Sequence, residues 1–215
     1  MFVSLLFSVM LPGFFGSAIV YDFTGSSISK HRKEFIMGKA TQDLLNEHEA
    51  ILHVFTILDK MLTSLDANEE RDLNFADELV HFLTIFADKC HHGKEEGFLF
   101  KELEALGVPN QGGPIGVMLQ EHVMGRQLIA SMREALQGAD LEAFKLHAVE
   151  YRDLLRQHIQ KENAVIFRLA DQLISDERQM ELFEKFEEHE ETVIGHGVHE
   201  QLHAQIHAWE TLYHL

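Results

Sequence analysis

One pattern occurs twice in this chain, as His91-His-Gly-Lys-Glu95 and as His158-Ile-Gln-Lys-Glu162. Each copy reads His-x-x-Lys-Glu, and an apolar run that ends in phenylalanine follows it. In a helix, residues four apart lie on the same face, one turn from each other. A neutral imidazole and a carboxylate at this spacing can therefore bind one metal ion together. Two copies in separate helices supply two histidines and two glutamates, which is the beginning of a dinuclear metal site.

The repeat extends into the segments that precede the two copies. His48 follows Asn-Glu, and His122 follows Gln-Glu, each in a helical pattern that leads to the next copy of His-x-x-Lys-Glu. A helix with one inward histidine, followed by a helix with His-x-x-x-Glu, therefore occurs twice. This predicts two helical hairpins related by a pseudo-twofold axis. The predicted metal ligands are His48, His91, Glu95, His122, His158 and Glu162.

These side chains suit two iron ions. With two histidines on each ion and both glutamates bridging, a bridging oxide or hydroxide supplies the fifth ligand of each ion. An octahedral ion then keeps one open position, where dioxygen, nitric oxide or peroxide can bind. Imidazole and carboxylate ligands without thiolate favour iron, with manganese and zinc as weaker fits. In two-metal sites the ions lie about 3.5–4 Å apart.

The double histidine of the first copy allows two registers. Glu96 is four residues after His92, so this pair has the same helical spacing as His91 and Glu95. Alignment of the two copies favours His91 as the ligand, because His92 then corresponds to Ile159.

Residues near the predicted ligands have alternative roles. Tyr151 lies two turns before the second copy and could donate a hydrogen bond or bind iron, although interior packing is favoured. We expect Lys94 and Lys161 to reach solvent or to pair with nearby acids. Glu47 and Glu121 are expected to be exposed, with orientation of the ligand histidines as the alternative.

The composition narrows the class of protein. Of the 215 residues, 46% are hydrophobic and 25% charged, and 3 are proline, which favours a helical domain with an appendage. The single Cys90 excludes an internal disulfide and a cysteine metal cluster, and it fits a reducing compartment. A net charge of −17 repels nucleic acid and anionic lipid. The 15 histidines exceed what structural use of this residue needs.

Hydrophobic periodicity and turn residues predict an antiparallel up-down-up-down bundle of four helices. The short connections carry Asp, Asn, Gly or Pro, and Asp140 can cap the last helix. The fold class is therefore all-α. The expected helices cover residues 42–65, 73–106, 115–136 and 141–173.

A C-terminal helical segment, residues 176–215, follows the predicted bundle domain of residues 37–175. It is acidic and rich in histidine, and it should form two amphipathic helices broken at residues 194–197. Phenylalanines in its first half are expected to pack on the bundle or to form a homodimer. His199, His203 and His207 are spaced for a metal-binding stripe, but a stripe that faces the bundle or a partner chain is favoured.

The first 36 residues have a different composition. Residues 1–21 carry no charge, but they lack the basic start of a signal peptide, and proline and glycine interrupt the apolar run. The favoured interpretation is that translation begins at Met37, because codons for Lys33-Glu34 can resemble a ribosome-binding sequence. We therefore expect residues 1–36 to be a non-native or signal-like extension. The protein is expected to be cytoplasmic, with no membrane partner unless this extension is translated.

The sequence resembles the hemerythrin-like, or HHE cation-binding, family over about residues 41–175. The resemblance rests on Asn-Glu-His48-Glu, the two His-x-x-Lys-Glu motifs and Glu-His122, in this order. It implies a four-helix bundle with a non-haem di-iron centre bridged by carboxylates. Oxygen-carrying hemerythrins have His-x-x-x-His in the third helix and an aspartate after the fourth-helix histidine. Arg126 and Glu162 occupy these positions here, which disfavours reversible oxygen carriage.

The expected function is binding or sensing of small oxygen or nitrogen species by a di-iron centre. A catalase- or peroxidase-like enzyme and an iron-handling or iron-centre repair protein are the alternatives. The chain has no cysteine-bearing N-terminal domain like that of some repair proteins. No dedicated acid–base residue stands out beside the predicted ligands, which disfavours the enzyme. The expected partners are a diatomic or peroxide ligand, no nucleic acid, and either none or a second copy through the C-terminal helices.

Overall fold

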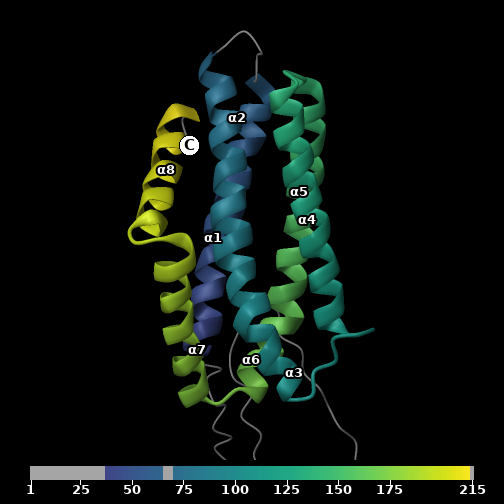
Figure 1. Cartoon of the computed structure of the whole chain (residues 1–215), viewed down its shortest axis with the longest axis vertical. Helices are drawn as coiled ribbons and strands as arrows, with labels where there is room; N and C mark the ends of the chain where they lie inside the picture. The colour runs from purple at the N-terminus through teal and green to yellow at the C-terminus, as the bar shows by residue number, and fades with distance from the viewer. Residues whose placement is uncertain (1–36, 65–69, 214–215) are drawn as a thin grey trace, which may run out of the picture. The chain divides into compact units, whose positions relative to one another are not determined.

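The four predicted bundle helices are present, and the all-α fold is confirmed (Figure 1). The structure, a computed structural model, describes residues 37–64 and 70–213; the expectations for residues 1–36 lie outside this range. Within the described residues there is no strand. The bundle comprises α1 (Lys39–Ser64), α2 (Glu70–Phe82), η1 (Leu83–His92), η2 (Glu95–Leu99), α3 (Phe100–Ala105), α4 (Pro114–Gln137), α5 (Leu141–Lys161), η3 (Glu162–Ile166) and α6 (Phe167–Leu173).

The second and fourth bundle helices are composite. One runs from α2 through η1 and η2 to α3, and the other from α5 through η3 to α6; the η segments are π-helical. Local chemistry determines the boundaries between helices. Pro114 begins α4, where its missing N–H costs nothing. Asp140 caps α5 as predicted, because its side chain accepts a hydrogen bond from the Ala143 N–H at 3.0 Å.

Two apolar clusters fill the bundle and leave a polar layer between them. The upper cluster, in the orientation of Figure 1, includes Phe55, Phe86 and Leu155; the lower cluster includes Leu44 and Phe100. Each bundle helix passes from one cluster to the other, and the predicted ligands occupy the stretch between them. This arrangement places the ligands at mid-height with apolar packing above and below, which keeps water out of the polar layer.

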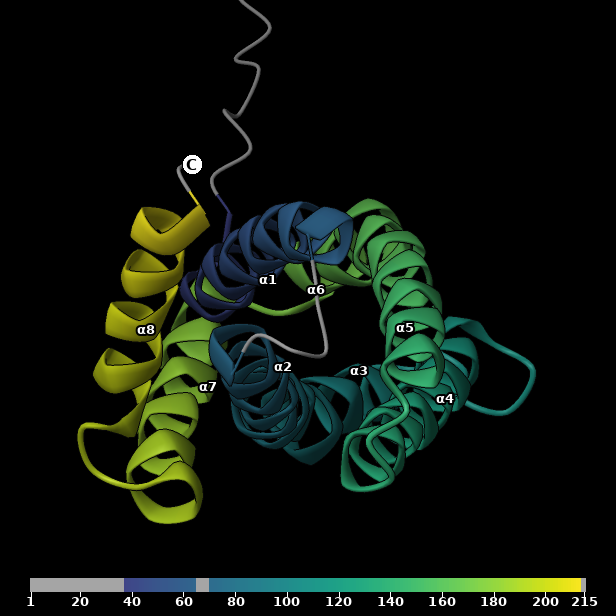
Figure 2. The same cartoon turned by 90° about the horizontal axis from the view of Figure 1, so that it is seen from above.

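The C-terminal segment forms α7 (Asp176–His189), η4 (Glu190–Ile194) and α8 (Val198–Tyr213), with the break at the predicted place. Seen from above in Figure 2, α7 and α8 lie beside α1 and α2 and away from α4 and α5. The buried face of α8 consists of Leu202, Ile206 and Trp209. The indole N–H of Trp209 donates to Glu78 Oε2 at 2.9 Å, which fixes α8 to the first hairpin.

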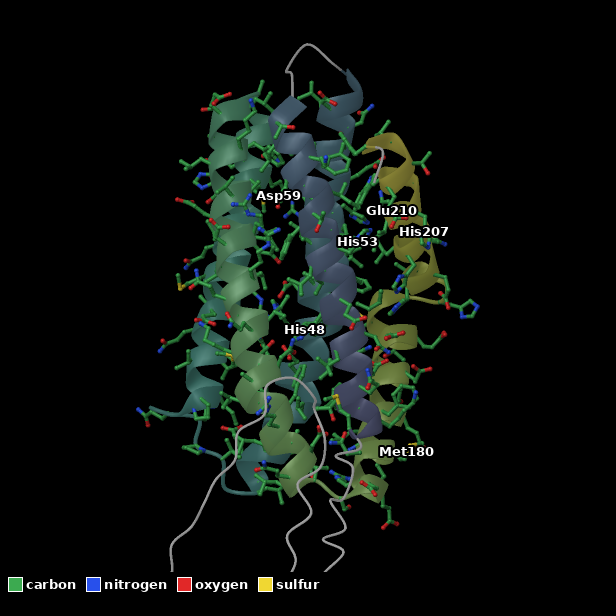
Figure 3. The ribbon with its side chains drawn as sticks, turned by 180° about the vertical axis from the view of Figure 1, so that it is seen from behind. His48, His53, Asp59, Met180, His207 and Glu210 are labelled. Atoms are coloured by element: carbon green, nitrogen blue, oxygen red, sulfur yellow. The ribbon has the colours of Figure 1, made fainter. Side chains whose placement is uncertain are left out.

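The histidine stripe of α8 does not face the bundle as a whole. His199 is half-buried, with its ring centroid 5.4 Å from that of Phe86. The side chain of His207 is 78% exposed and lies on the outer side of α8 (Figure 3). The face that packs on the bundle is the apolar one, and the stripe runs along its edge.

None of the described helices combines the length and the apolar character that crossing a lipid bilayer requires.

Candidate metal centre

The structure brings all six predicted ligands into the polar layer, where their side chains are buried. His48 comes from α1, the two copies of His-x-x-Lys-Glu from the composite helices, and His122 from α4. The donors form two groups, in each of which one atom per residue lies within 4.8 Å of the others. The first group is His48, His91, Glu95 and Glu162; the second is His92, Glu95, His122 and His158.

The two glutamates lie between the groups. Glu95 directs Oε1 toward His91 Nε2 at 3.7 Å and Oε2 toward His122 Nε2 at 3.4 Å. Glu162 Oε2 lies 3.2 Å from His48 Nε2 and 3.1 Å from His158 Nε2. Each carboxylate therefore faces one histidine from each hairpin, which is the arrangement that a bridging ligand requires.

The four predicted ligand histidines are each held through Nδ1. His91 pairs with Glu47 at 2.9 Å and His158 with Glu121 at 3.0 Å. His122 pairs with Glu96, and His48 with the amide oxygen of Asn163, both at 2.7 Å. A carboxylate or amide oxygen can only accept, so each contact places a proton on Nδ1. The Nε2 lone pairs then face the centre, as metal ligation requires.

The residues that hold the histidines follow the same repeat as the ligands. Glu47 and Glu121 each precede a ligand histidine, and Glu96 and Asn163 each follow a ligand glutamate. The expectation that Glu47 and Glu121 are exposed was wrong: Glu47 is buried, and the side chain of Glu121 is 14% exposed. The pseudo-twofold repeat was the signal that could have identified them, since they occur at equivalent places in both hairpins.

The two lysines of the repeat differ in their surroundings. Both pair with acids, Lys94 with Glu47 and Lys161 with Glu121. The side chain of Lys94 is 0% exposed and also pairs with Asp43 and Glu190, whereas that of Lys161 is 41% exposed. Burial alone would lower the pKa of Lys94, but the charge of Glu47 and its neighbours raises it, so the buried ammonium stays protonated.

Buried donor atoms without a hydrogen bond indicate that the centre fits a cation. Among the described residues, Nε2 of His48 and His91 and both oxygens of Glu95 and Glu162 have no hydrogen-bond partner, although they are buried. An unsatisfied buried polar group is costly, and native proteins rarely keep so many together. Nitrogen and carboxylate oxygen donors that converge in this way suit iron, manganese or zinc ions.

The spacing of two histidines in the second group also indicates that the centre fits a cation. His122 Nε2 lies 3.1 Å from His158 Nε2, close to the roughly 3.0 Å expected for two adjacent ligands with metal–nitrogen bonds of about 2.1 Å. Because the Nδ1 protons of both rings are engaged, two lone pairs would face each other without a proton or metal ion between them. Burial alone would lower the pKa of His122, but the carboxylates of Glu162, Glu95 and Glu96 raise it to about 11.

This pKa predicts that metal ions compete with a proton. In metal-free protein His122 stays protonated below about pH 11, so at neutral pH a metal ion must displace that proton. We expect ferrous iron binding to release at least about one proton per chain at pH 7, and its apparent affinity to increase as the pH is raised. Calorimetric titration in buffers of different ionisation enthalpy measures the released protons. Binding heats that do not depend on the buffer would contradict the prediction.

π-helical turns accompany the ligand glutamates. η2 begins at Glu95 and η3 at Glu162, so the turn starts at the equivalent residue in both hairpins. π-helical turns insert one extra residue and are frequent at functional sites. The four-residue spacing of histidine and glutamate is kept, because each glutamate carboxylate still lies beside the histidine of its own motif.

A third set of possible donors, Glu47, Cys90, Glu190 and His199, is different in kind. The ammonium of Lys94 lies among them, 2.9 Å from Glu47 Oε1 and paired with Glu190. Burial raises the pKa of the Cys90 thiol, and the charge of Glu47 adds to that effect. A cation is already present there, and the thiol is not a ready ligand.

Two other residues lie outside the donor groups. Tyr151 is fully buried in the upper cluster, with its ring against that of Phe55, as the packing interpretation predicts. Arg126, at the position of the third-helix histidine of oxygen carriers, donates to Asp88 and to Glu96, both at 2.7 Å. It therefore supports the carboxylate that holds His122 and supplies no metal ligand.

A four-helix bundle with paired histidines in its core and two glutamates between them defines a candidate dinuclear metal protein. The model of the hemerythrin HHE cation binding domain matches residues 39–170, and the chain belongs to this family. Its members are cation-binding bundles, in agreement with the resemblance found in the sequence. No curated protein and no solved structure matched the chain significantly.

Proposed function

We propose that this protein holds two iron ions and senses a small oxygen or nitrogen species, with the C-terminal helices as the responding element. The donor set supports iron, because it combines imidazole and carboxylate and lacks thiolate. Iron would supply a redox couple and positions for an exogenous ligand. His48, His91, His122 and His158 would hold the ions, with Glu95 and Glu162 between them. A reducing compartment such as the cytoplasm fits the free thiol of Cys90.

The surrounding residues keep the donors in place and exclude water. Glu47, Glu96, Glu121 and Asn163 hold the imidazole rings through Nδ1. The upper and lower clusters cover the polar layer, so only small species are expected to reach it. A small, water-poor centre of this kind suits a diatomic or peroxide ligand better than a larger organic substrate.

The observation that favours a sensor is a chain of contacts that begins at the buried centre and ends at half-buried residues of the C-terminal helices. His91 Nδ1 contacts Glu47, Glu47 contacts Lys94, and Lys94 pairs with Glu190 of η4. Glu190 continues to His199 of α8, whose Nδ1 lies 3.1 Å from Glu190 Oε2. A change of charge at the metal would alter how strongly His91 attracts the Glu47 carboxylate, and Lys94 is the cation that Glu47 and Glu190 share. Among the described residues, only the first hairpin has such a link.

The test is metal analysis and optical spectroscopy, combined with hydrogen exchange of α8 in the oxidised, reduced and nitric oxide-treated states. We expect about two irons per chain and a state-dependent change in α8 protection. Zinc, or no metal in anaerobically prepared protein, would refute the iron centre. Rapid peroxide consumption that disappears in Glu162→Ala would support the enzyme instead. Equal α8 protection in all states would refute the sensor.

Glu190→Ala should loosen the C-terminal helices. The variant removes a carboxylate shared by Lys94 and His199, so we expect amide exchange in α8 to become about 10-fold faster. Glu191→Ala is the matched control, because the adjacent Glu191 side chain is 60% exposed and pairs only with His196 among the described residues. Equal exchange rates in the two variants would show that Glu190 does not stabilise the C-terminal helices.

A further inference from the structure

The two halves of the centre differ at one buried position. The hairpins match in their ligands and in the residues that hold the ligands, yet His92 occupies the place that Ile159 has in the second hairpin. Both residues are buried, 1% and 2% exposed. A fifth imidazole therefore lies beside the centre in the first hairpin, where an apolar residue would satisfy packing equally well.

The ring of His92 lacks the partners that the other histidines have. Among the described residues, neither of its nitrogens has a hydrogen bond, and Nδ1 lies 3.5 Å from Asp88 Oδ1. Asp88 is itself engaged by the guanidinium of Arg126. Burying an imidazole without a partner costs free energy, so a group that pairs with one of its nitrogens is expected.

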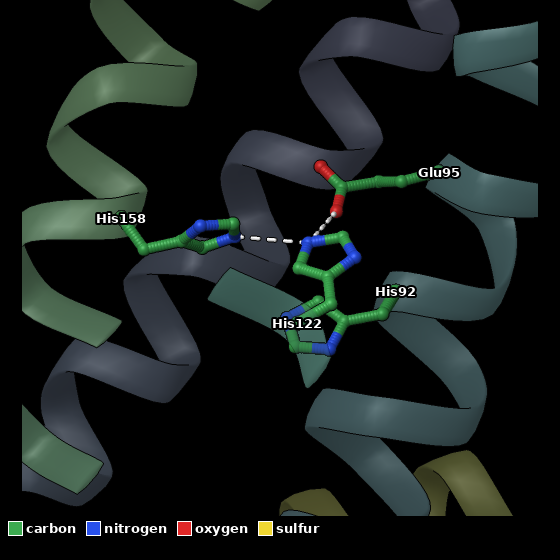
Figure 4. A group of neighbouring side chains, drawn as sticks. All are labelled: His92, Glu95, His122 and His158. Carbon is green, nitrogen blue, oxygen red and sulfur yellow. Dashed lines mark hydrogen bonds and ion pairs between the residues drawn. The ribbon is translucent and has the colours of Figure 1, made fainter. Parts of the chain in front are cut away.

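One nitrogen of His92 lies within the second donor group. It is within 4.8 Å of a donor atom from each of Glu95, His122 and His158 (Figure 4). Ligands of an octahedral ion with bonds of about 2.1 Å lie roughly 3.0 Å apart when adjacent and about 4.2 Å apart when opposite. The separations of His122 Nε2 from His158 Nε2 (3.1 Å) and from Glu95 Oε2 (3.4 Å) have this size, and the His92 nitrogen lies at the edge of the same group.

The ring of His92 lies parallel to that of His122, with centroids 3.8 Å apart and planes at 17°. Rings that bind one ion point toward it from different directions, so this stack must open when both nitrogens bind. The contact keeps His92 beside the centre, and a rotation about its side-chain torsions is the movement that ligation would require.

We infer that His92 is a third imidazole ligand of the ion held by His122 and His158, so that the two ions have unequal ligand sets. The inference rests on the proposed di-iron centre. With both glutamates and a bridging oxide or hydroxide, the third imidazole would complete six ligands on that ion. The ion at His48 and His91 would have five, so the exchangeable position would belong to it. This is also the ion that Glu47 and Lys94 would link to the C-terminal helices, so binding of an exogenous ligand there would be transmitted to those helices.

His92→Ile tests the inference, because it gives the first hairpin the residue that the second already has. We expect anaerobic titration with ferrous iron to show one of two sites weakened by at least about 10-fold, with the other unchanged. Mössbauer spectra should show two unequal ferrous sites in the parent and two similar sites in the variant. His147→Ile, at a partly exposed histidine of α5 outside both donor groups, is the control.

A measurement on the unaltered protein covers the case in which the variant does not fold. Cobalt-loaded protein should show five shifted, solvent-exchangeable imidazole N–H signals in its NMR spectrum when five histidines bind metal, and four when His92 does not. Four signals, or parent-like affinities and spectra in His92→Ile, would overturn the inference and leave the di-iron proposal intact. A parent protein that binds no iron would instead refute the proposed function and the inference with it.

Discussion

Glu162→Ala protein is expected to bind less than one iron per chain at metal concentrations that load the parent with two. Glu162 Oε2 is close to Nε2 of His48 and of His158, and its Oε1 lies 3.7 Å from His122 Nε2. Its removal takes a donor from both ions and half of the carboxylate charge between them. Since loss of a residue that merely orients a ligand costs about 10- to 100-fold in metal affinity, loss of a bridging ligand should exceed about 100-fold.

Glu142→Ala is the control for this experiment. Its side chain is 85% exposed at the start of the same composite helix and pairs only with Lys145 among the described residues. Iron content by elemental analysis after anaerobic loading gives the comparison, with circular dichroism to show that both variants are folded. A Glu162→Ala protein that keeps two irons at parent affinity would mean that the glutamates do not bridge the ions.

Lys94→Ala should be the most destabilising single change near the centre, by about 3–5 kcal/mol in the free energy of unfolding. Lys94 is buried among Glu47, Asp43 and Glu190, so its removal leaves several carboxylates together without a cation. Burial alone would raise the pKa of Glu47, but His91 and Lys94 lower it to about 2. The Glu47 carboxylate is therefore charged at neutral pH, and its charge is stabilised by His91 and Lys94.

The second hairpin offers the matched control, Lys161→Ala. Lys161 has the equivalent place and the equivalent partner, Glu121, but its side chain is 41% exposed, so we expect a loss of about 1 kcal/mol or less. Denaturant unfolding of the metal-free proteins measures both values without a contribution from bound metal. Similar losses in the two variants would contradict the assignment of Lys94 as the cation of a buried cluster.

The fold and the convergence of the six candidate ligands could be predicted because they depend on spacing along the chain. Apolar residues at helical intervals place the bundle helices, and the repeated His-x-x-x-Glu fixes which side chains share a face. The expected helix of residues 141–173 is observed as α5, η3 and α6 with the same bounds.

The partners of the ligands were harder to predict. Whether Glu47 reaches His91 across two helices depends on crossing geometry and side-chain torsions, which periodicity does not determine. The burial of Lys94 was missed for another reason, because it requires Glu190 from the C-terminal segment. The amphipathic pattern of α8 predicts that one face is buried, but it does not identify the surface against which that face packs. For this reason the difference in burial between Lys94 and Lys161 became visible only in three dimensions.

The number of residues in each π-helical turn determines how the residues after Glu95 and Glu162 are oriented. A π-turn contains one residue more than an α-turn, and each residue rotates an α-helix by about 100°. Phe100 after η2 and Phe167 after η3 reach the lower cluster with that extra residue in place. Deleting one residue from either turn would keep the chemistry of every donor while rotating the following phenylalanine out of register. The loss of a single residue would thus disrupt the apolar packing below the centre without altering any of the six predicted ligands.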